Sequence, residues 1–190
     1  MLTLDVGCGS KPSGGVNVDC FSGGWNSQEG DQKQGEFMNP HSIPNFVVAD
    51  SMFLPFRDEC FDTVFSSHVI EHVKNPSRML SELLRVSRLR VVVKCPHKRG
   101  SGAKRPFHVN FLDENWFKRA LAKLGYSANV FASFFDYYHP VTSRLSRLCP
   151  RKFQFLFSQN ILYLVVWQVE KDLLKVPFEI EVRVSKSSEI

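Results

Sequence analysis

The sequence predicts an open α/β fold with a mostly parallel sheet, and three strand ends are the main evidence for it. The apolar run at residues 4–6 carries Asp5 and stops in the glycine turn Gly7-Cys8-Gly9. Glycines at such a point let the backbone turn tightly and allow a ligand to come close. Asp19 and Asp50 end two later apolar runs. Because parallel strands end at one edge of a sheet, the three carboxylates are expected to meet where open α/β sheets bind ligands.

The first half of the chain reads as short buried strands joined by irregular segments. Val- and Phe-rich runs predict strands at residues 2–6, 16–19, 46–50 and 61–66. Only Gly7–Gly15 separates the first two strands, whereas a parallel crossover usually needs a dozen or more residues. The first crossover helix is therefore expected to be missing or reduced to a turn. Phe21 to Pro44 is polar and rich in Gly, Asn, Gln and Ser, which predicts a long insertion.

Helix signals dominate the middle of the chain. Asn75-Pro76 is a good helix start, with Asn as the N-cap and Pro at the first helical position. A strand is expected at residues 89–95, and Asp113 caps a second helix that ends at Gly125. Residues 127–131 and 161–170 read as two further strands.

Length and composition favour one domain. The 190 residues suit a single domain at 1–170 with the insertion at 21–44, followed by a C-terminal extension at 171–190. Five cysteines form no metal-like pairs, and their odd number is typical of reduced thiols. No secretory segment opens the chain, and the apolar run at 161–169 is too short to span a bilayer. We therefore expect a soluble, cytoplasmic protein with no membrane partner.

The net charge of +5 is unevenly distributed. Two windows without acids, between Glu82 and Asp113 and between Asp136 and Glu170, hold half of the 24 basic residues. Such asymmetry favours an anionic partner, although a solvated charged surface explains it equally well.

Four sequence blocks, taken in order, resemble the class I S-adenosylmethionine-dependent methyltransferases with a short Gly-Cys-Gly motif. These blocks are residues 4–9, 16–19, 47–56 and 61–73. The resemblance implies a Rossmann-like, mostly parallel sheet with helices on both faces and an antiparallel closing strand. It also implies S-adenosylmethionine as cofactor and S-adenosylhomocysteine as product. The family's helical segment before the first strand is absent, so a partner subunit, a second copy, the insertion or the C-terminal third is expected to cover the substrate.

The resemblance also implies which residues contact the cofactor. Asp5 and the glycine turn would surround its methionine end, Asp19 would accept hydrogen bonds from the ribose, and Asp50 would accept from the adenine amino group. The complete implied set is Asp5, Gly7, Cys8, Gly9, Asp19, Asp50, Ser51, Met52, Ser66 and His68. Alternatively, the three acids only cap turns, as Asp commonly does.

The segment His68-Val69-Ile70-Glu71-His72 offers an alternative metal site. Helical spacing would place His68, Glu71 and His72 on one face, where they could hold a divalent cation. Certain O-methyltransferases that this chain resembles bind a cation through Glu-x-x-Glu-His here, but His68 replaces their first Glu. We therefore expect no metal and keep this set as the alternative.

Methyl transfer mainly requires positioning and removal of a proton from the acceptor. His97 and His108 flank the basic segment and are the candidate catalytic bases, with His139 as a third. Each of these histidines would alternatively be an ordinary surface or core residue.

The predicted function is methyl transfer to an unidentified, anionic acceptor. A small molecule is favoured over RNA, because no separate nucleic-acid module is visible and the aromatic residues are expected to be buried. An RNA methyltransferase, a non-catalytic cofactor-binding or interaction subunit, and a basic RNA-binding protein remain alternatives. An NAD-dependent dehydrogenase is disfavoured, because Pro12 stands where its fingerprint needs a third glycine.

Overall fold

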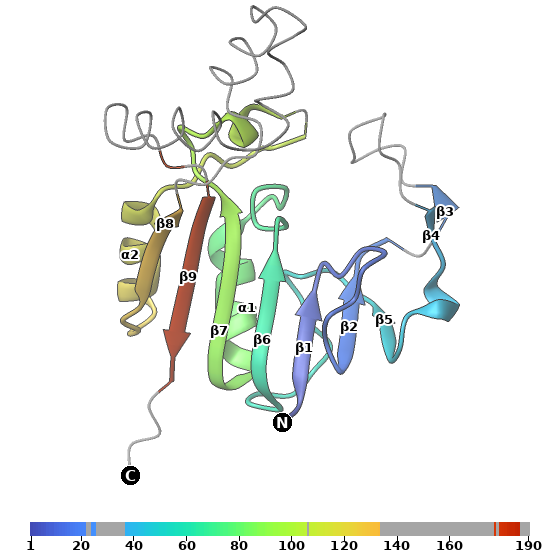
Figure 1. The fold of residues 1–190 in the computed structure, drawn as a ribbon. Helices are drawn as coiled ribbons and strands as arrows, with labels where there is room; N and C mark the ends of the chain where they lie inside the picture. The colour runs from blue at the N-terminus through green and yellow to red at the C-terminus, as the bar shows by residue number, and fades with distance from the viewer. Residues whose placement is uncertain (22–23, 26–36, 106, 134–176, 178, 187–190) are drawn as a thin grey trace, which may run out of the picture.

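The fold is built on one seven-stranded sheet (Figure 1). The computed structural model describes residues 1–21, 24–25, 37–105, 107–133, 177 and 179–186. The strand order is β5-β2-β1-β6-β7-β9-β8. The strands are β1 (Thr3–Val6), β2 (Val16–Asp19), β5 (Phe46–Val48), β6 (Phe61–Ser67), β7 (Ser87–Pro96), β8 (Asn129–Ser133) and β9 (Glu179–Ser185). Neighbours from β5 to β7 pair in parallel, and β9 is antiparallel to both β7 and β8, which confirms the predicted sheet.

β9 corrects the prediction for the end of the chain. Residues 171–190 were expected to be an extension, but Glu179–Ser185 lies between β7 and β8 inside the sheet. Its alternate residues Ile180, Val182 and Val184 are fully buried, as expected for a strand packed on one face. The strand predicted at 161–170 falls outside the described residues.

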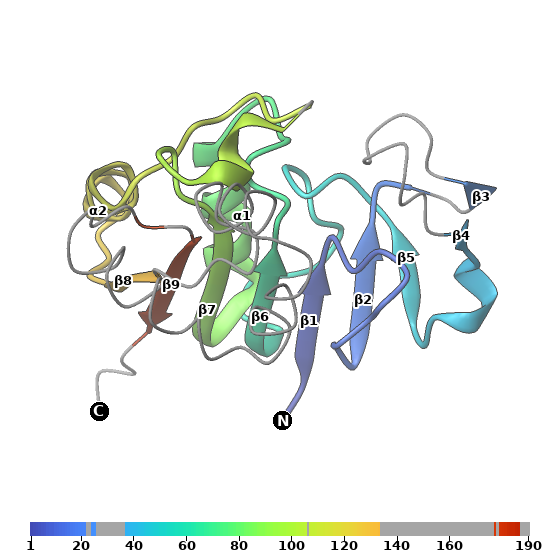
Figure 2. The same cartoon turned by 45° about the horizontal axis from the view of Figure 1, so that its top comes forward.

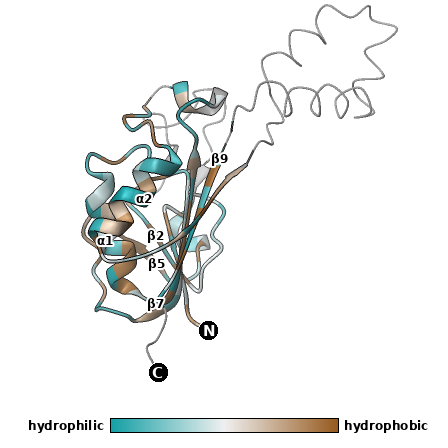
Figure 3. Cartoon of the chain, turned by 90° about the vertical axis from the view of Figure 1, so that its left-hand side faces the viewer, coloured by the Kyte–Doolittle hydropathy of each residue, from teal (hydrophilic) through white to brown (hydrophobic). Residues whose placement is uncertain are grey.

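Within the described residues, two α-helices cover one face of the sheet. α1 (Pro76–Val86) and α2 (Glu114–Lys123) begin where the sequence predicts, because Asn75 and Asp113 accept hydrogen bonds from the backbone N–H groups of Arg78 and Trp116. Figure 3 shows both helices on the same side of the sheet. Helices on both faces were expected, but the described residues place none on the opposite face. No described helix is long and apolar enough to cross a membrane.

The connection between β1 and β2 is made without a helix, as predicted. Residues 7–15, all of them described, form only turns and irregular backbone. The Asp5 Oδ2 atom accepts hydrogen bonds from the Ser13 N–H and hydroxyl, both at 2.8 Å, and so holds this connection against β1. A Cβ on Gly14 would come within 2.7 Å of the Asp5 nitrogen, so the two segments can pack this closely only with glycine.

The predicted insertion has structure at its ends. β3 (Gly24–Trp25) pairs antiparallel with β4 (Phe37–Met38), and the 3₁₀ helix η1 (Pro40–Ser42) follows. Figure 2 shows the β3–β4 pair beyond the β5 edge of the sheet. A second 3₁₀ helix, η2 (Ser101–Lys104), follows β7. The described ends of the insertion therefore form a small sheet that is separate from the seven-stranded one.

Candidate active site

A cavity of about 410 Å³ lies at the carboxyl ends of β1, β2, β5 and β6. Six of the ten residues that the resemblance assigned to the cofactor line it, namely Gly7, Asp19, Asp50, Ser51, Met52 and His68. His72 and Lys74 also line it, although they were not in the predicted cofactor set. The structure thus brings the ends of four strands and the turn after β6 to one hollow.

The other four predicted residues support the cavity without lining it. The Asp5 carboxylate is bound to Ser13, and the Ser66 hydroxyl donates to the Val6 carbonyl oxygen at 2.9 Å. Cys8 is buried beside Ile43, and this burial raises the pKa of its thiol to about 12. The Gly9 N–H donates to the Asp19 Oδ2 atom at 3.0 Å. Partners within the protein thus engage the Asp5 and Ser66 side chains, and cofactor contact by these four residues stays a prediction.

Both cavity acids hold the loops that carry them. Asp19 accepts the N–H of Gly9 through Oδ2 and the N–H of Phe21 through Oδ1, at 3.0 and 2.9 Å. Asp50 Oδ1 accepts the Met52 N–H at 2.8 Å, so that amide is engaged within the loop. A carboxylate oxygen has more than one lone pair, so these contacts leave both acids able to accept from a ligand as well.

Gly7 is required at its position for two reasons. Its φ of +77° lies in the left-handed region, and a Cβ there would come within 2.0 Å of the Val69 Cγ2 atom. The backbone N–H groups of Gly7 and Cys8 both donate to the Val18 carbonyl oxygen. The turn after β1 is thus fixed to the end of β2, and Val69 fills the space that a side chain would take.

His68, on the cavity wall, lies between two carboxylates. Its Nδ1 and Nε2 atoms lie 3.3 Å from Glu71 Oε1 and Glu179 Oε2, respectively. Contact with Glu179, and then with Glu71, raises the pKa of His68 to about 9. Glu179 comes from β9, which the sequence did not place in the sheet.

The placement of His97 argues against its predicted role as a base. Its side chain is only 2% exposed, and it does not line the cavity. Nδ1 accepts the Arg99 N–H, so the proton lies on Nε2, which contacts Glu114 at 3.1 Å. Burial lowers the pKa of His97. His97 therefore holds the segment after β7 against α2, and His139 lies outside the described residues.

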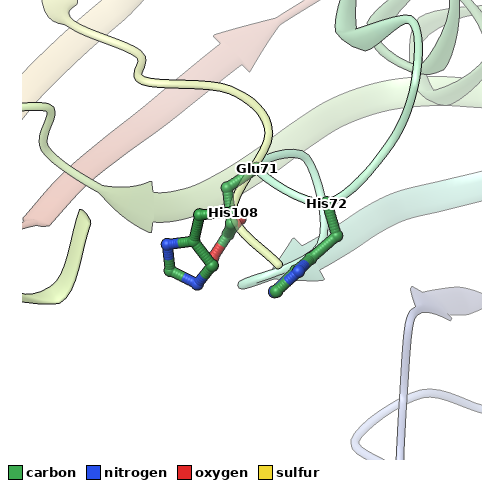
Figure 4. Close-up of side chains that lie close together, drawn as sticks. All are labelled: Glu71, His72 and His108. Atoms are coloured by element: carbon green, nitrogen blue, oxygen red, sulfur yellow. The ribbon is translucent and has the colours of Figure 1, made fainter. Parts of the chain in front are cut away.

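His108, the other predicted base, lies beside the cavity-lining His72. The two rings meet edge to face with centroids 4.7 Å apart. Burial, with a smaller contribution from His72, lowers the pKa of His108. Figure 4 shows Glu71 in the same group, and one ligand atom from each of the three residues lies within 4.8 Å of the others.

This cluster differs from the metal set that helical spacing suggested. His68 has a φ of +57°, and the segment from His68 to Lys74 forms turns instead of a helix. His68, Glu71 and His72 therefore do not share a helical face, and His108 arrives from a distant segment. The only sequence signal for His108 was its place beside the basic residues.

The aromatic residues also depart from expectation. Phe107 and Phe111 are about half exposed, on the segment that carries His108. Phe53 is 64% exposed, after the loop that carries Asp50. The expectation that the aromatic residues are buried is therefore wrong for these three and for Phe131 on β8, and the first three leave apolar surface near the site.

Comparisons with known proteins point to the methyltransferases. Residues 24–90 match the family model described as a methyltransferase domain. An uncharacterized methyltransferase of Mycobacterium leprae is 34% identical over 90 residues, covering 46% of this chain and 33% of the relative. The tRNA (carboxymethyluridine(34)-5-O)-methyltransferase of Saccharomyces cerevisiae is 33% identical over 90 residues, covering 47% and 32%. The chain thus spans about a third of the length of these curated relatives.

Solved structures share the fold. A SAM-dependent methyltransferase from Archaeoglobus fulgidus aligns with a TM-score of 0.57 and 19% identity, covering 97% of this chain and 85% of that one. A possible histamine N-methyltransferase from Thermotoga maritima gives 0.56 and 18%, covering 98% and 82%. Residues 24–90 thus carry the sequence signature of a methyltransferase domain, and the chain shares its fold with SAM-dependent methyltransferases.

Proposed function

We propose that this chain binds S-adenosylmethionine in the cavity and transfers its methyl group to an anionic acceptor, with a small molecule as the first candidate. One observation carries the proposal: Asp19 and Asp50, from the ends of neighbouring strands, line the same cavity as Gly7. The methyltransferase-domain match of residues 24–90 supports the same assignment.

The cavity suits an adenosyl ligand chemically. Ribose hydroxyls and the adenine amino group are hydrogen-bond donors, and the two carboxylates are acceptors. The volume of about 410 Å³ falls in the usual range for small-molecule sites, roughly 300–1,000 Å³. Apolar walls from Val6, Val18 and Ala49 complete it. These features fit a nucleoside better than a purely anionic ligand.

Two cations on the cavity wall support an anionic group in the ligand or acceptor. His68 and Lys74 both line the cavity, and the raised pKa of His68 keeps it charged at neutral pH. Both ring nitrogens of His68 already face Glu71 and Glu179, so a carboxylate or phosphate in the cavity would take its charge-assisted hydrogen bond from Lys74. The acceptor class follows from this charge, together with the basic segment after β7.

S-adenosylmethionine, when bound, supplies a methyl group that its sulfonium already activates. The chain therefore has to orient the acceptor and take its proton. His72 lines the cavity and His108 contacts it, so this pair is best placed for the proton. The lowered pKa of His108 leaves its ring neutral, and so able to accept a proton, at neutral pH.

Calorimetry with S-adenosylmethionine, S-adenosylhomocysteine and NAD tests the proposal. Asp50→Ala should weaken the first two about ten- to a hundredfold, the usual cost of a lost bond to a charged group. Asp50→Asn keeps an oxygen for the Met52 N–H and so separates loop support from ligand contact. Asp58→Ala, an exposed acid outside the cavity wall, is the control. Unchanged binding in Asp50→Ala, or preference for NAD, contradicts the proposal; binding without turnover on any acceptor favours a non-catalytic subunit.

An RNA acceptor is the second candidate, because Phe107 and Phe111 are exposed beside basic residues. Aromatic faces next to Lys and Arg are typical of single-stranded nucleic-acid binding. Similarity to the yeast tRNA methyltransferase over 90 residues points in the same direction. Filter binding with a single-stranded RNA across a salt series distinguishes the two, since RNA affinity should fall steeply with salt and with Phe107→Ala.

A further inference from the structure

Glu71 has a buried carboxylate that the described protein groups do not satisfy. Its side chain is 2% exposed, and neither oxygen has a hydrogen-bond partner among the described residues. His68 Nδ1 lies 3.3 Å from Oε1 but outside hydrogen-bond geometry, so that contact is electrostatic only. An incompletely paired buried carboxylate is costly, which suggests that a further positive partner belongs there.

Two histidines beside Glu71 have their Nδ1 atoms occupied. His72 Nδ1 lies 3.1 Å from the Phe107 carbonyl oxygen, and His108 Nδ1 lies 3.1 Å from the Ala103 carbonyl oxygen. A carbonyl oxygen can only accept, so each Nδ1 must carry the proton. In the neutral ring the Nε2 lone pair is then free. Backbone contacts of this kind orient metal-binding histidines in many proteins.

We infer that Glu71, His72 and His108 form a binding site for a divalent transition-metal cation. Their ligand atoms all lie within 4.8 Å of one another (Figure 4). Ligands of a tetrahedral zinc ion lie about 3.3 Å apart, at about 2.0–2.1 Å from the metal, so the group must contract by no more than about 1.5 Å. Two imidazoles and one carboxylate suit zinc or a similar first-row cation and leave at least one coordination position open.

Because the Glu71–His72–His108 site lies next to the cavity, a bound cation could contact the acceptor. His72 belongs both to the cluster and to the cavity wall, so the cation would lie at the rim of the cavity. An oxygen or nitrogen of the acceptor can take the open coordination position, where the cation orients it and eases loss of its proton. The two histidines would then act as ligands instead of as bases. This role rests on the proposed function, whereas cation binding itself does not.

His68 stays paired when a cation occupies Glu71. Its second nitrogen is 3.3 Å from Glu179 Oε2, so displacement from Glu71 leaves one carboxylate partner. The two positive charges would compete for Glu71, and their competition is the main cost of binding. Replacement of His68 by Asn should therefore raise the affinity for the cation. If Glu71 serves only to balance the charge of His68, the cluster should bind no cation in either form.

Zinc titration of the full, tag-free, chelator-treated chain tests the inference by calorimetry. One zinc ion per chain is expected. His108→Ala and Glu71→Gln should each weaken the zinc affinity on the order of a hundredfold or more, because loss of a residue that only supports a ligand already costs about 10- to 100-fold. His41→Ala, an exposed histidine on η1, is the matched control and should bind zinc as the unmodified chain does. Cooperative thermal unfolding of the same variants shows that they fold.

Cobalt substitution provides a measurement on the unmodified chain, in case the variants do not fold. A cobalt spectrum with nitrogen and oxygen ligands supports the site, whereas a thiolate charge-transfer band places the metal on cysteine and overturns it. No saturable zinc binding, or equal affinity in His108→Ala, also overturns it. Because zinc alone is the probe, failure to bind S-adenosylhomocysteine would count against the proposed function and not against this site.

Discussion

At the scale of single residues, His68 connects the end of β6 to β9 through its contacts with two carboxylates. Its ring follows β6 in a left-handed backbone conformation and meets Glu71, which is close in the sequence, and Glu179, which comes from the distant β9. The sequence predicted that His68 belongs to the cavity, but not that it is held as a cation. That property comes from Glu179, whose strand was not predicted.

The charge of His68 predicts a dependence of stability on pH. The folded-state pKa of about 9 is higher than the ordinary value of 6.5, so folding favours the protonated ring. The stabilisation is fully present below about pH 6.5 and is lost as the pH rises through 9. The thermal midpoint should therefore fall between pH 7 and pH 10 more steeply than in His68→Asn, which removes the titrating ring and tolerates the positive φ.

Solvent limits the size of this effect, because the His68 side chain is 47% exposed. His41→Asn, an exposed histidine on η1, controls for loss of a histidine elsewhere. Identical pH profiles for the unmodified chain and His68→Asn would show that the two carboxylates do not hold the proton.

At the scale of elements, α1 is tied to the loop that leads out of β5. The Glu82 Oε2 atom accepts the Leu54 N–H at 2.9 Å and the Arg85 Nη2 at 2.8 Å. Arg85 also donates to the carbonyl oxygens of Phe56 and Leu54. The contact with Arg85 lowers the pKa of Glu82, so the carboxylate stays charged although it is buried. Through these contacts, α1 positions the loop that carries Asp50.

Glu82→Ala should destabilise the fold by about 1.5–3 kcal/mol, because it removes a charged acceptor and leaves the Leu54 N–H without its bond. Urea unfolding measures the loss. Arg78→Ala is the control, because the Arg78 side chain is exposed and its ion pair with Glu82 is long, at 3.6 Å. This substitution should lower the free energy of unfolding by less than about 1 kcal/mol. Equal losses in the two variants would mean that the buried bond network is not what fixes the loop.

At the scale of the whole molecule, the last described strand completes the sheet. β9 pairs with β7 over seven residues and with β8 over five. Its residues 180, 182 and 184 join the same core as α1 and β1. Folding of the domain therefore depends on residues that composition alone suggested were an appendage.

Ile180→Ala should lower the free energy of unfolding by about 2–5 kcal/mol, the usual cost of such a truncation in a packed core. Ser185→Ala, at the exposed end of the same strand, should change it by no more than about 0.5 kcal/mol. Denaturant unfolding of both variants provides the measurement. A change in Ile180→Ala as small as in Ser185→Ala would place β9 outside the cooperative core.

Short-range signals account for the features that the amino-acid order predicts without help from long-range contacts. The N-caps Asn75 and Asp113 accept hydrogen bonds from N–H groups three residues away, so both helix starts are determined by residues close in the sequence. The ends of β1 and β2 follow from nearby apolar runs. The missing helix between them follows from the short length of the connecting segment. Gly7, Asp19, Asp50 and His68 came instead from the family resemblance, as expected cofactor contacts, and all four line one cavity.

The folded chain alone reveals which distant segments meet. The charge of His68 depends on Glu179, more than a hundred residues away, and the Glu71–His72–His108 cluster depends on where the segment after β7 folds back. The place of β9 depends on which strands it pairs with. Apolar alternation gives a strand its face but not its neighbour, so pairing is settled only when the whole sheet closes around one core.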